Sequence, residues 1–481
     1  MQLSALLEGV RITEVHADLN MDISGVCCDT RLVQPGGLFV ASTGYGADRH
    51  AYLPVATEKG AAVAVCERAP EDGLPYVLVP DTRIAEAVIA ANWYGHPAKR
   101  LTLVGITGTN GKTTVSYLIR SLLEQLFDAK VGLIGTIQNL IGDEVVETAN
   151  TTPGAMELQA LFARMADAGC THVVMEVSSH ALALERVGGV HFDTAVFTNL
   201  TQDHLDFHKT MEAYGDAKAL LFARCDHAVL GADDPAWEKM AAAFDGVPLT
   251  YGTAAGCNLR AENIELAADH VAFTVDGVPV RLGIPGGFSV SNALAAMGAA
   301  VSLGASPEAT AAALQNARGV KGRVEVVPTP GQPYTILIDY AHTPDGLENV
   351  LRSVKGFARG RTVAVFGCGG DRDPIKRPIM GRIAAEIADF VVVTSDNPRT
   401  EDPQKILDDI LVGMRDTTTP YVVVENRREA IRWAMDHAQP EDVIVLAGKG
   451  HETYQILGTE KTHLDEREEV AAHLATLATK E

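Results

Sequence analysis

The sequence lacks a long apolar segment, a basic leader and a paired cysteine motif. No run of about 18 or more apolar residues occurs, so we expect no membrane-spanning helix. The first residues, MQLSALLEGVRITEV, have no basic region followed by an apolar stretch, so we expect no signal peptide. The 7 cysteines are scattered and contain no C-x-x-C pair, which argues against a disulfide framework or a zinc site. These absences predict a soluble, cytoplasmic protein.

Positive charge is also scarce. Lys and Arg number 40 against 62 Asp and Glu, giving a formal net charge of −22. Such a chain repels nucleic acid and anionic lipid, so we expect neither a nucleic-acid partner nor stable membrane association. A polyanionic small molecule would need local basic groups. No tandem repeat or low-complexity segment occurs, and a length of 481 residues suggests about three domains.

Apolar, β-branched runs alternate with helix-like patterns, which predicts the α/β fold class. Helices are expected over 82–94, over 115–126 and from 289. Breaks at 95–100 and 319–333 divide the chain into three parts. The third part has the pattern of an open doubly wound sheet. Strands are predicted over 24–28, 38–41, 62–66, 76–79, 101–106, 130–135, 172–177, 194–199, 228–231, a polar region at 263–282, 336–339, 363–366, 390–394, 421–424 and 443–446.

The segment LTLVGITGTNGKTT (101–114) predicts a phosphate-binding loop, since a buried strand runs through a glycine turn into a helix. Glycines let backbone N–H groups approach anionic oxygens, and the helix N-terminus adds its dipole. Lys112 would neutralise phosphate charge, and a hydroxyl would bind Mg²⁺. Five residues separate Gly105 from Gly111, one more than in G-x-x-x-x-G-K-[ST]. The structural context rather than the spacing therefore supports the prediction.

Two polar segments follow neighbouring predicted strands. MEVSSH (175–180) contains Glu176, and NLTQDHLDFH (199–208) contains His204. In a parallel sheet both would lie at the edge that carries the phosphate loop, as candidate Mg²⁺ ligands. The alternative is that they are ordinary hydrogen-bonded loop residues.

Lys218 lies on an apolar helical stripe with Tyr214, Leu221 and Phe222. A lysine in such a position usually extends its ammonium group to solvent. Beside a metal site, a neutral amine would instead capture carbon dioxide as an anionic carbamate. The residue pattern leaves both alternatives open.

Three charged loops follow strands in the third part: GCGGDRD (367–373), DNPR (396–399) and GKGHE (448–452). None is a G-x-G-x-x-G dinucleotide motif. Arg372, Arg399 and Glu452 would form a pocket for a zwitterion, in which guanidinium binds carboxylate and Glu binds ammonium. A set of solvated loop charges is the alternative.

Ten motifs occur in a family's order: GITGTNGKTT, EVSSHAL, NLTQDHLDFH, YGDAKALLF, SNALAA, KGRVE, DYAHTPD, GCGGDRD, SDNPRTEDP and AGKGHETYQ. Over essentially the whole chain, the set resembles the ATP-dependent Mur ligases of peptidoglycan assembly, whose phosphate loop has this longer form. The resemblance implies a small α/β UDP-binding domain (1–98), a central P-loop ATPase-type parallel sheet domain (99–326) and a C-terminal Rossmann-like domain that binds an amino acid (327–481).

The resemblance also implies roles for individual residues. It implies phosphate binding by Gly108, Thr109, Asn110, Gly111, Lys112, Thr113 and Thr114, and nucleotide contacts from Asn292, Arg323, Asp339 and His342. Mg²⁺ ligands would be Thr113, Glu176, His204 and a carboxylated Lys218; catalytic groups would be Lys112, Lys218, His204 and Glu176. Substrate contacts would be Cys28, Thr30, Tyr45, Gly46, Ala47, Asn150, Thr151, Thr152, Ser178, Leu184, Arg186, Arg372, Asp396, Asn397, Pro398, Arg399, Gly448 and Glu452.

Two departures from the family pattern stand out. Leu184 occupies a position where related sequences often carry glutamine, and Cys28-Asp29-Thr30 is looser than the usual small-hydroxyl pattern. The DNPR form resembles that of ligases that take meso-diaminopimelate, because lysine has no distal carboxylate for Arg399 to pair with.

The implied activity is amide formation between meso-diaminopimelate and the D-glutamate γ-carboxylate of UDP-MurNAc-L-Ala-D-Glu. The carboxylate would become an acyl phosphate, with Lys112, Mg²⁺ and Arg323 stabilising charge. The amine would then displace phosphate after domain closure, and the enzyme would act as a monomer. The alternatives are an L-lysine-adding ligase, a folylpolyglutamate-synthase-like ligase without the UDP domain, and a regulatory nucleotide switch.

Overall fold

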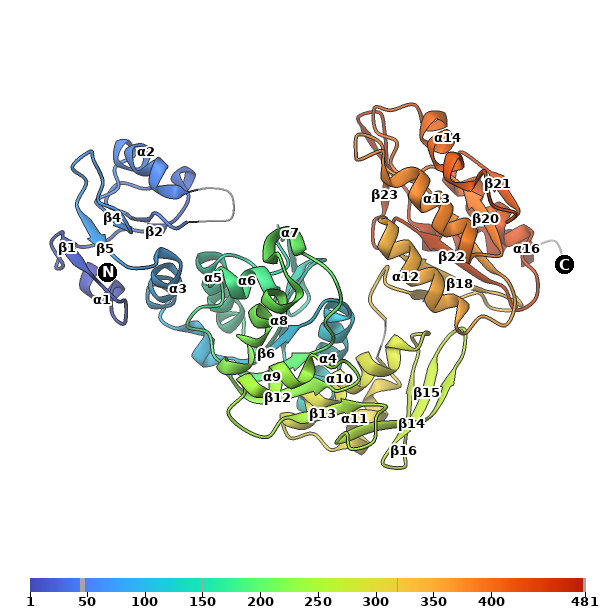
Figure 1. Cartoon of the computed structure of the whole chain (residues 1–481), viewed down its shortest axis with the longest axis horizontal. Coiled ribbons are helices and arrows are strands. Elements are labelled where there is room, and N and C mark those ends of the chain that lie inside the picture. Colours follow the sequence, from blue (N-terminus) through green and yellow to red (C-terminus); the bar gives the residue numbers. More distant parts are fainter. Residues whose placement is uncertain (44–47, 149, 318, 479–481) are drawn as a thin grey trace. The chain divides into compact units, whose positions relative to one another are not determined.

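The computed structural model describes residues 1–43, 48–148, 150–317 and 319–478 (Figure 1). Its contacts group into two compact units: residues 1–260 with 294–310, and residues 261–293 with 311–481. Within the described ranges, no helix combines the length and apolarity needed to cross a membrane.

The N-terminal part of the first unit is a small five-stranded sheet in the order β1-β5-β4-β3-β2. Its strands are parallel except for β1, which is antiparallel to β5. The Asp81 side chain caps helix α3 (Thr82–Trp93) by accepting from the N–H groups of Arg83 and Ile84. The elements are α1 (Leu3–Leu6), β1 (Glu14–His16), β2 (Val26–Cys27), β3 (Leu38–Val40), α2 (Leu53–Glu58), β4 (Val63–Cys66), β5 (Tyr76–Leu78) and α3 (Thr82–Trp93), with short 3-10 turns at Thr30–Leu32, Arg49–Tyr52 and Pro97–Arg100.

The rest of the first unit is built on a mainly parallel sheet in the order β13-β12-β11-β6-β10-β7-β8-β9. The elements are β6 (Thr102–Thr107), α4 (Lys112–Phe127), β7 (Val131–Ile134), β8 (Asn139–Ile141), β9 (Glu144–Val146), α5 (Ala155–Asp167), β10 (His172–Glu176), α6 (Ser179–Ala183), β11 (Phe192–Phe197), α7 (Leu205–His208), α8 (Met211–Ala219), β12 (Cys225–Gly231), α9 (Trp237–Ala243) and β13 (Leu249–Gly252), with a 3-10 turn at Phe222–Arg224.

Strand β6 positions the candidate site because both of its neighbours are parallel to it. Glu176 at the end of β10 lies opposite Ile106, and Phe197 at the end of β11 lies opposite Thr107. The loops that follow these strands therefore leave the same edge of the sheet. This confirms the predicted placement of the phosphate loop and of the segments after 176 and 197.

The second unit contains an antiparallel set of strands, β14 (Leu259–Leu266), β15 (Val271–Val275) and β16 (Val278–Leu282), of which β14 begins in the first unit. It also contains a six-stranded sheet in the order β17-β18-β22-β19-β20-β21. Helices α10 (Phe288–Ser302) and α11 (Pro307–Leu314) contribute residues to both units. The other elements are β17 (Glu325–Val327), β18 (Thr335–Asp339), α12 (Pro344–Lys355), β19 (Thr362–Phe366), α13 (Lys376–Ile387), β20 (Phe390–Val393), α14 (Pro403–Met414), β21 (Tyr421–Val423), α15 (Arg427–Asp436), β22 (Val443–Ala447), β23 (Tyr454–Leu457), β24 (Glu460–His463) and α16 (Glu466–Ala478).

The six-stranded sheet is doubly wound. One core packs residues of α12, α13 and α14, such as Leu347, Met380 and Ile410, against one set of strand side chains. A second core packs Ile431 of α15 and Val470 of α16 against the alternate set. Only β17 runs antiparallel, so the expected open doubly wound sheet is confirmed.

The predicted α/β class is confirmed, and each predicted strand overlaps an observed one. The boundaries proposed at 98/99 and 326/327 stay predictions. Gly105 lies inside β6, where an added Cβ would approach the Phe192 ring to 2.9 Å. Gly105 therefore packs within the sheet, and the turn of the phosphate loop is made by Gly108 and Gly111.

Candidate active site

The phosphate loop turns at two glycines. Gly108 has φ of 149° and Gly111 has φ of 87°, conformations that favour glycine. A Cβ on Gly108 would also collide with the Thr198 hydroxyl. Lys112 is the first residue of α4, and its Nζ donates to the carbonyl oxygens of Gly108 and Thr109, each at 2.9 Å. The loop thus folds around a lysine ammonium at a helix N-terminus, the arrangement that binds phosphate oxygens.

Glu176 lies beside this loop and is 1% exposed. Its Oε1 accepts from Thr113 Oγ1 and from the Thr136 N–H, each at 3.0 Å, and its Oε2 accepts from Thr136 Oγ1 at 3.0 Å. These donors are all neutral, so the carboxylate charge is solvated without being cancelled. A buried carboxylate joined to a loop hydroxyl is a suitable oxygen ligand for Mg²⁺.

Lys218 of α8 is 1% exposed, which excludes extension of its ammonium group to solvent. Its Nζ donates to the Gly108 carbonyl at 2.9 Å and lies 4.4 Å from the centre of the Tyr214 ring. Burial, followed by repulsion from Lys112, holds the pKa of Lys218 well below its usual value. The side chain therefore has the raised neutral fraction that carbamate formation requires.

His204 immediately precedes α7, as its N-cap, and has a left-handed backbone with φ of 51°. Its ring centre lies 4.8 Å from that of His180 and 6.1 Å from that of Tyr214. In the neighbouring His208, Nε2 shares a hydrogen bond of 2.8 Å with Ser179 Oγ. Burial lowers the pKa of His208 to about 4. The Tyr214 ring therefore lies close to both His204 and Lys218.

The residues expected to contact the dipeptide surround Glu176. Thr151 and Thr136 share a hydroxyl hydrogen bond of 3.0 Å. Thr152 Oγ1 donates to the Glu176 carbonyl at 2.8 Å and accepts from the Ser178 N–H at 3.0 Å. Arg186 Nη1 donates to the Thr152 carbonyl at 2.9 Å. The structure therefore brings Thr151, Thr152, Ser178 and Arg186 together. The Asn150 carbonyl accepts a hydrogen bond from the Thr148 hydroxyl.

Leu184 and Arg186 line a pocket of about 300 Å³. Ser42, Arg49, Arg83 and Glu86 also line it. Leu184 offers no hydrogen bond there, so a glutamine-like contact to a substrate is absent at this position. The guanidinium groups of this pocket suit an anionic ligand.

The predicted UDP contacts are only partly described. Burial, and to a smaller extent the negative charge of Glu86, raises the pKa of Cys28 to about 12, so its thiol stays neutral. Thr30 begins a 3-10 turn, and its carbonyl accepts from Lys59 Nζ at 2.8 Å. Tyr45, Gly46 and Ala47 lie outside the described residues.

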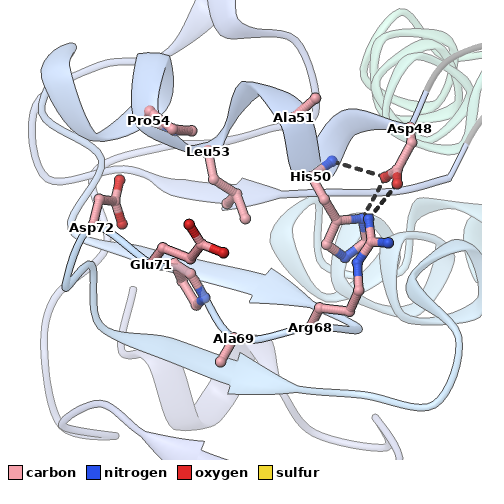
Figure 2. A pocket seen from close by; sticks show the side chains of 10 residues that line it. Asp48, His50, Ala51, Leu53, Pro54, Arg68, Ala69, Glu71 and Asp72 are labelled. Carbon is pink, nitrogen blue, oxygen red and sulfur yellow. Dashed lines mark hydrogen bonds and ion pairs between the residues drawn. The ribbon is translucent and has the colours of Figure 1, made fainter.

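A second pocket in the N-terminal sheet, of about 620 Å³, is lined by residues that the sequence did not single out (Figure 2). His50 Nδ1 contacts Asp48 Oδ1 at 2.6 Å, and His50 Nε2 accepts from the Glu67 N–H at 2.8 Å. Arg68 also pairs with Asp48. These polar groups satisfy one another's hydrogen bonds. His50 therefore has a structural role: it links Asp48 to the residue that follows β4.

The remaining predicted nucleotide contacts lie in the second unit. Arg323 lies 5.6 Å from the Tyr340 ring, and the His342 ring lies 4.5 Å from it. Asp339 Oδ2 accepts from the Val324 N–H at 2.8 Å, and burial raises the pKa of Asp339 to about 6. Arg323, Asp339 and His342 therefore cluster around Tyr340, whereas Asn292 lies on α10.

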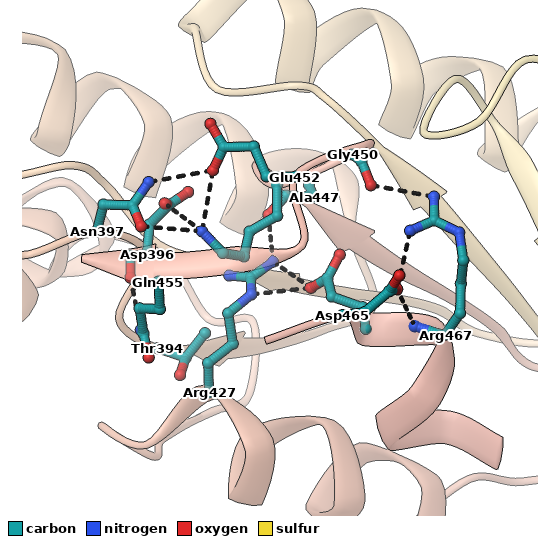
Figure 3. Close-up of polar contacts among 12 residues, drawn as sticks. Thr394, Asp396, Asn397, Arg427, Ala447, Gly450, Glu452, Gln455, Asp465 and Arg467 are labelled. Atoms are coloured by element: carbon teal, nitrogen blue, oxygen red, sulfur yellow. Dashed lines mark hydrogen bonds and ion pairs between the residues drawn. The ribbon is translucent and has the colours of Figure 1, made fainter. Parts of the chain in front are cut away.

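The DNPR and GKGHE loops meet in the second unit (Figure 3). Asn397 Nδ2 donates to Glu452 Oε2 at 3.1 Å. Gly448 has φ of 119°, and an added Cβ would lie 2.7 Å from Asp396 Oδ2. The structure therefore brings Asp396, Asn397, Gly448 and Glu452 together, as the resemblance implied, and makes the glycine necessary.

Arg399 and Arg372 both lie near the glycine turn after β19. Arg399 Nη1 donates to the Gly370 carbonyl at 2.8 Å, and the Arg399 N–H donates to the Ile456 carbonyl at 3.1 Å. An added Cβ on Gly369 would lie 3.0 Å from Arg399 Nη1 and 3.9 Å from Arg372 Cγ. Pro398 precedes Arg399 and approaches Gly370 through its carbonyl. The Arg399 guanidinium and the aliphatic part of Arg372 thus both lie near this turn, while Arg372 Nη1 donates to the Asp371 carbonyl at 3.0 Å.

Lys449 is the residue of this loop cluster that the sequence reasoning missed. Its side chain is fully buried, and Nζ lies within 3.4 Å of acceptors on Asp396, Asn397 and Glu452. The available signal was its position inside GKGHE, between two residues already assigned to the site.

The donor set around the phosphate loop fits a hard cation that is shared with phosphate. Among the described residues, no group of three or more His, Cys, Asp or Glu is arranged to hold a metal by itself. Mg²⁺ commonly binds through one or two carboxylates, with phosphate and water completing its coordination. Glu176 and the Thr113 hydroxyl match that pattern.

The fold and this site define a class of ligase. Residues 106–300 match the Mur ligase middle domain, and residues 322–450 match the Mur ligase glutamate ligase domain. The chain belongs to the Mur ligase family.

Individual relatives narrow the comparison. The chain is 48% identical, over 99% of both chains, to the UDP-N-acetylmuramoyl-L-alanyl-D-glutamate–2,6-diaminopimelate ligase of Caldanaerobacter subterraneus subsp. tengcongensis. It is 47% identical to the ligase of the same name from Gloeobacter violaceus, over 95% of this chain and 94% of that one. A solved structure with this name matches at 30% identity and a TM-score of 0.74, covering 99% of each chain.

Proposed function

We propose that this protein is an ATP-dependent ligase that adds meso-diaminopimelate to the D-glutamate γ-carboxylate of UDP-MurNAc-L-Ala-D-Glu in peptidoglycan precursor synthesis. The observation that carries the proposal is the 48% identity, over 99% of both chains, to a ligase whose name specifies diaminopimelate. The phosphate loop beside a buried carboxylate and the charged strand-end loops of the second unit support it.

In the proposed mechanism, Lys112 and the N–H groups at the start of α4 bind the phosphates of ATP. Thr113 and Glu176 would hold Mg²⁺, and the ion would supply positive charge near the transferred phosphoryl group. The substrate's γ-carboxylate attacks the γ-phosphorus of ATP and displaces ADP, which gives an acyl phosphate. The amine of the amino acid then attacks the carbonyl carbon of the acyl phosphate. The C–N bond forms, phosphate leaves and the amine releases a proton. Lys218, as its carbamate, and His204 would complete the proposed set of ligands.

The amino acid is proposed to bind in the second unit. Arg399 and Arg372 would pair with a carboxylate, and Glu452 with an ammonium group. Lysine lacks the distal carboxylate, so the same site favours diaminopimelate. We further propose that the protein acts as a cytoplasmic monomer on these small molecules, with Thr152, Ser178 and Arg186 contacting the muramoyl dipeptide, and with Arg323, Asp339, His342 and Asn292 contacting the nucleotide.

The direct test is nucleotide release with purified protein, ATP, Mg²⁺ and UDP-MurNAc-L-Ala-D-Glu. We expect ADP and phosphate only when an amino acid is also present, with meso-diaminopimelate far more effective than L-lysine. Production of AMP and pyrophosphate would contradict the acyl-phosphate route. Equal rates with lysine would favour the lysine-adding alternative.

Replacement of Arg399 by alanine should raise the KM for diaminopimelate by about 10- to 100-fold, the scale of one lost charge-assisted ion pair. The KM for ATP should change by less than about twofold, because the guanidinium group would contact the amino acid rather than the nucleotide. Alanine retains a Cβ, so the left-handed backbone of this residue (φ of 52°) gains no new strain. Steady-state kinetics with each substrate varied in turn measures both constants.

Arg415→Ala, at an exposed position after α14, is the matched control and should leave both constants unchanged. Equal increases in the two KM values for Arg399→Ala would remove Arg399 from the amino-acid site.

A further inference from the structure

A fully buried ammonium group lies behind the proposed amino-acid site. Lys449 follows β22 and is 0% exposed. Its Nζ contacts Asp396 Oδ1 at 3.4 Å, Asn397 Oδ1 at 3.0 Å and Glu452 Oε2 at 3.1 Å (Figure 3). An ammonium group has three protons, and here three acceptors from two loops surround it.

These contacts fix the orientation of the Asn397 amide. Its Oδ1 accepts from Lys449 and from the Ile456 N–H at 3.0 Å, so its Nδ2 must face Glu452 Oε2. Glu452 Oε2 therefore receives both the lysine and the amide. Among the described residues, the other oxygen, Glu452 Oε1, accepts one long hydrogen bond, of 3.4 Å, from the Tyr454 hydroxyl. One carboxylate oxygen is thus held in place while the other stays available to a donor.

Lys449 is shared between two carboxylates. Its ammonium group pairs with both Asp396 and Glu452, at 3.4 and 3.1 Å. The neighbouring Arg427 and Glu466, both with fully buried side chains, pair at 2.7 Å and so cancel each other. The Arg427 guanidinium also donates to the Ala447 carbonyl at 2.9 Å, which anchors the end of β22 two residues before Lys449. The Glu452 oxygen that Lys449 does not contact can therefore accept from a cationic group on a ligand.

We propose that Lys449 is a specificity-determining positioning residue: it holds Asp396, Asn397 and Glu452 so that one oxygen of Glu452 faces the ammonium group of the incoming amino acid. This inference rests on the proposed function and assigns the residue that orders its amino-acid site. Lys449 acts through Glu452 and Asn397 and does not itself contact the substrate.

The test is Lys449→Met, which keeps the length of the buried side chain and removes its charge. We expect the KM for meso-diaminopimelate to rise about 10- to 100-fold, with kcat within about threefold and the KM for ATP within about twofold, because the lost contacts order one binding site only. Lys461→Met is the matched control: this lysine covers the same Tyr454 ring at 3.7 Å and is exposed. It should behave as the unsubstituted protein.

A double-mutant cycle with Glu452→Gln separates positioning from a general structural role. If Lys449 acts through Glu452, adding Lys449→Met to Glu452→Gln should raise the diaminopimelate KM by less than about threefold further. Fully multiplicative effects, or equal changes in the ATP and diaminopimelate KM values, would overturn the inference. Lys449→Gln, which retains an amide donor, replaces the methionine variant if thermal unfolding shows that Lys449→Met is not folded. Loss of folding in both variants would also overturn the positioning role.

The two levels of the proposal fail differently. If the unsubstituted protein releases no ADP with diaminopimelate, the proposed function fails. If it does so and Lys449→Met retains the same diaminopimelate KM, only the assignment of Lys449 fails.

Discussion

Lys112→Met is expected to reduce kcat/KM for ATP by about 10³-fold, the upper range for one preorganised charge on a transferring phosphoryl group. The Lys112 ammonium lies at the N-terminus of α4 and within 2.9 Å of the Gly108 and Thr109 carbonyls, where it faces the inside of the loop. Methionine keeps much of the side-chain volume and removes the charge. ADP release measures the rate, and calorimetric titration with ADP measures nucleotide affinity.

Lys130→Met provides the control, because Lys130 lies on the same domain and donates at the protein surface to the Ala168 carbonyl at 2.7 Å. It should leave kcat/KM unchanged within about twofold, as expected of a surface substitution. A Lys112→Met enzyme that retains activity within threefold of the unsubstituted protein would remove Lys112 from the proposed phosphate site.

Lys218→Ala should lower kcat by about 10² to 10³-fold, and small carboxylates such as acetate or propionate should restore part of the loss. The expectation follows from the burial of Lys218, its lowered pKa and its contact with the Gly108 carbonyl at 2.9 Å. A carbamate supplies an anionic oxygen at this position, and an added carboxylate would replace it in the space that alanine leaves. ADP release with and without each carboxylate measures the rescue.

A second measurement tests the modification itself. Protein supplied with ¹³C-bicarbonate should show a carbamate carbon resonance that Lys218→Ala lacks. Lys239→Ala is the control: this half-buried lysine pairs with Asp216 of α8 and not with the phosphate loop, so its loss should not alter kcat or the resonance. Full activity of Lys218→Ala without additives would refute a functional carbamate, and loss of activity without rescue would leave the ammonium group as the required form.

Much of the site was predictable because its residues follow strands with strong local signals. The apolar runs before Glu176 and before Asn199 identify β10 and β11, and the parallel arrangement places their ends beside the loop of β6. The same reasoning located the loops that contain Arg399 and Glu452. Local pattern and sheet topology together determine these positions.

Other features depend on contacts between distant segments. The helical neighbours of Lys218 indicated an apolar stripe, but the phosphate loop, 110 residues earlier, determines that its amine is buried. Arg427 and Glu466 are 39 residues apart, and neither shows its partner locally. Strand β24 has mostly exposed residues and no apolar alternation, so this strand gave no local signal.

The pairing of Arg427 with Glu466 also has a consequence for the order of synthesis. Asp396, Arg427 and Lys449 all precede Glu466 in the chain, so the ribosome produces them first. Until Glu466 and the start of α16 emerge, Arg427 lacks the counter-charge that it has when fully buried. A buried guanidinium without its partner costs about 3–5 kcal/mol. The strands around the amino-acid site can therefore close fully only after the last helix has been made, whereas the phosphate loop and its sheet can fold earlier during translation.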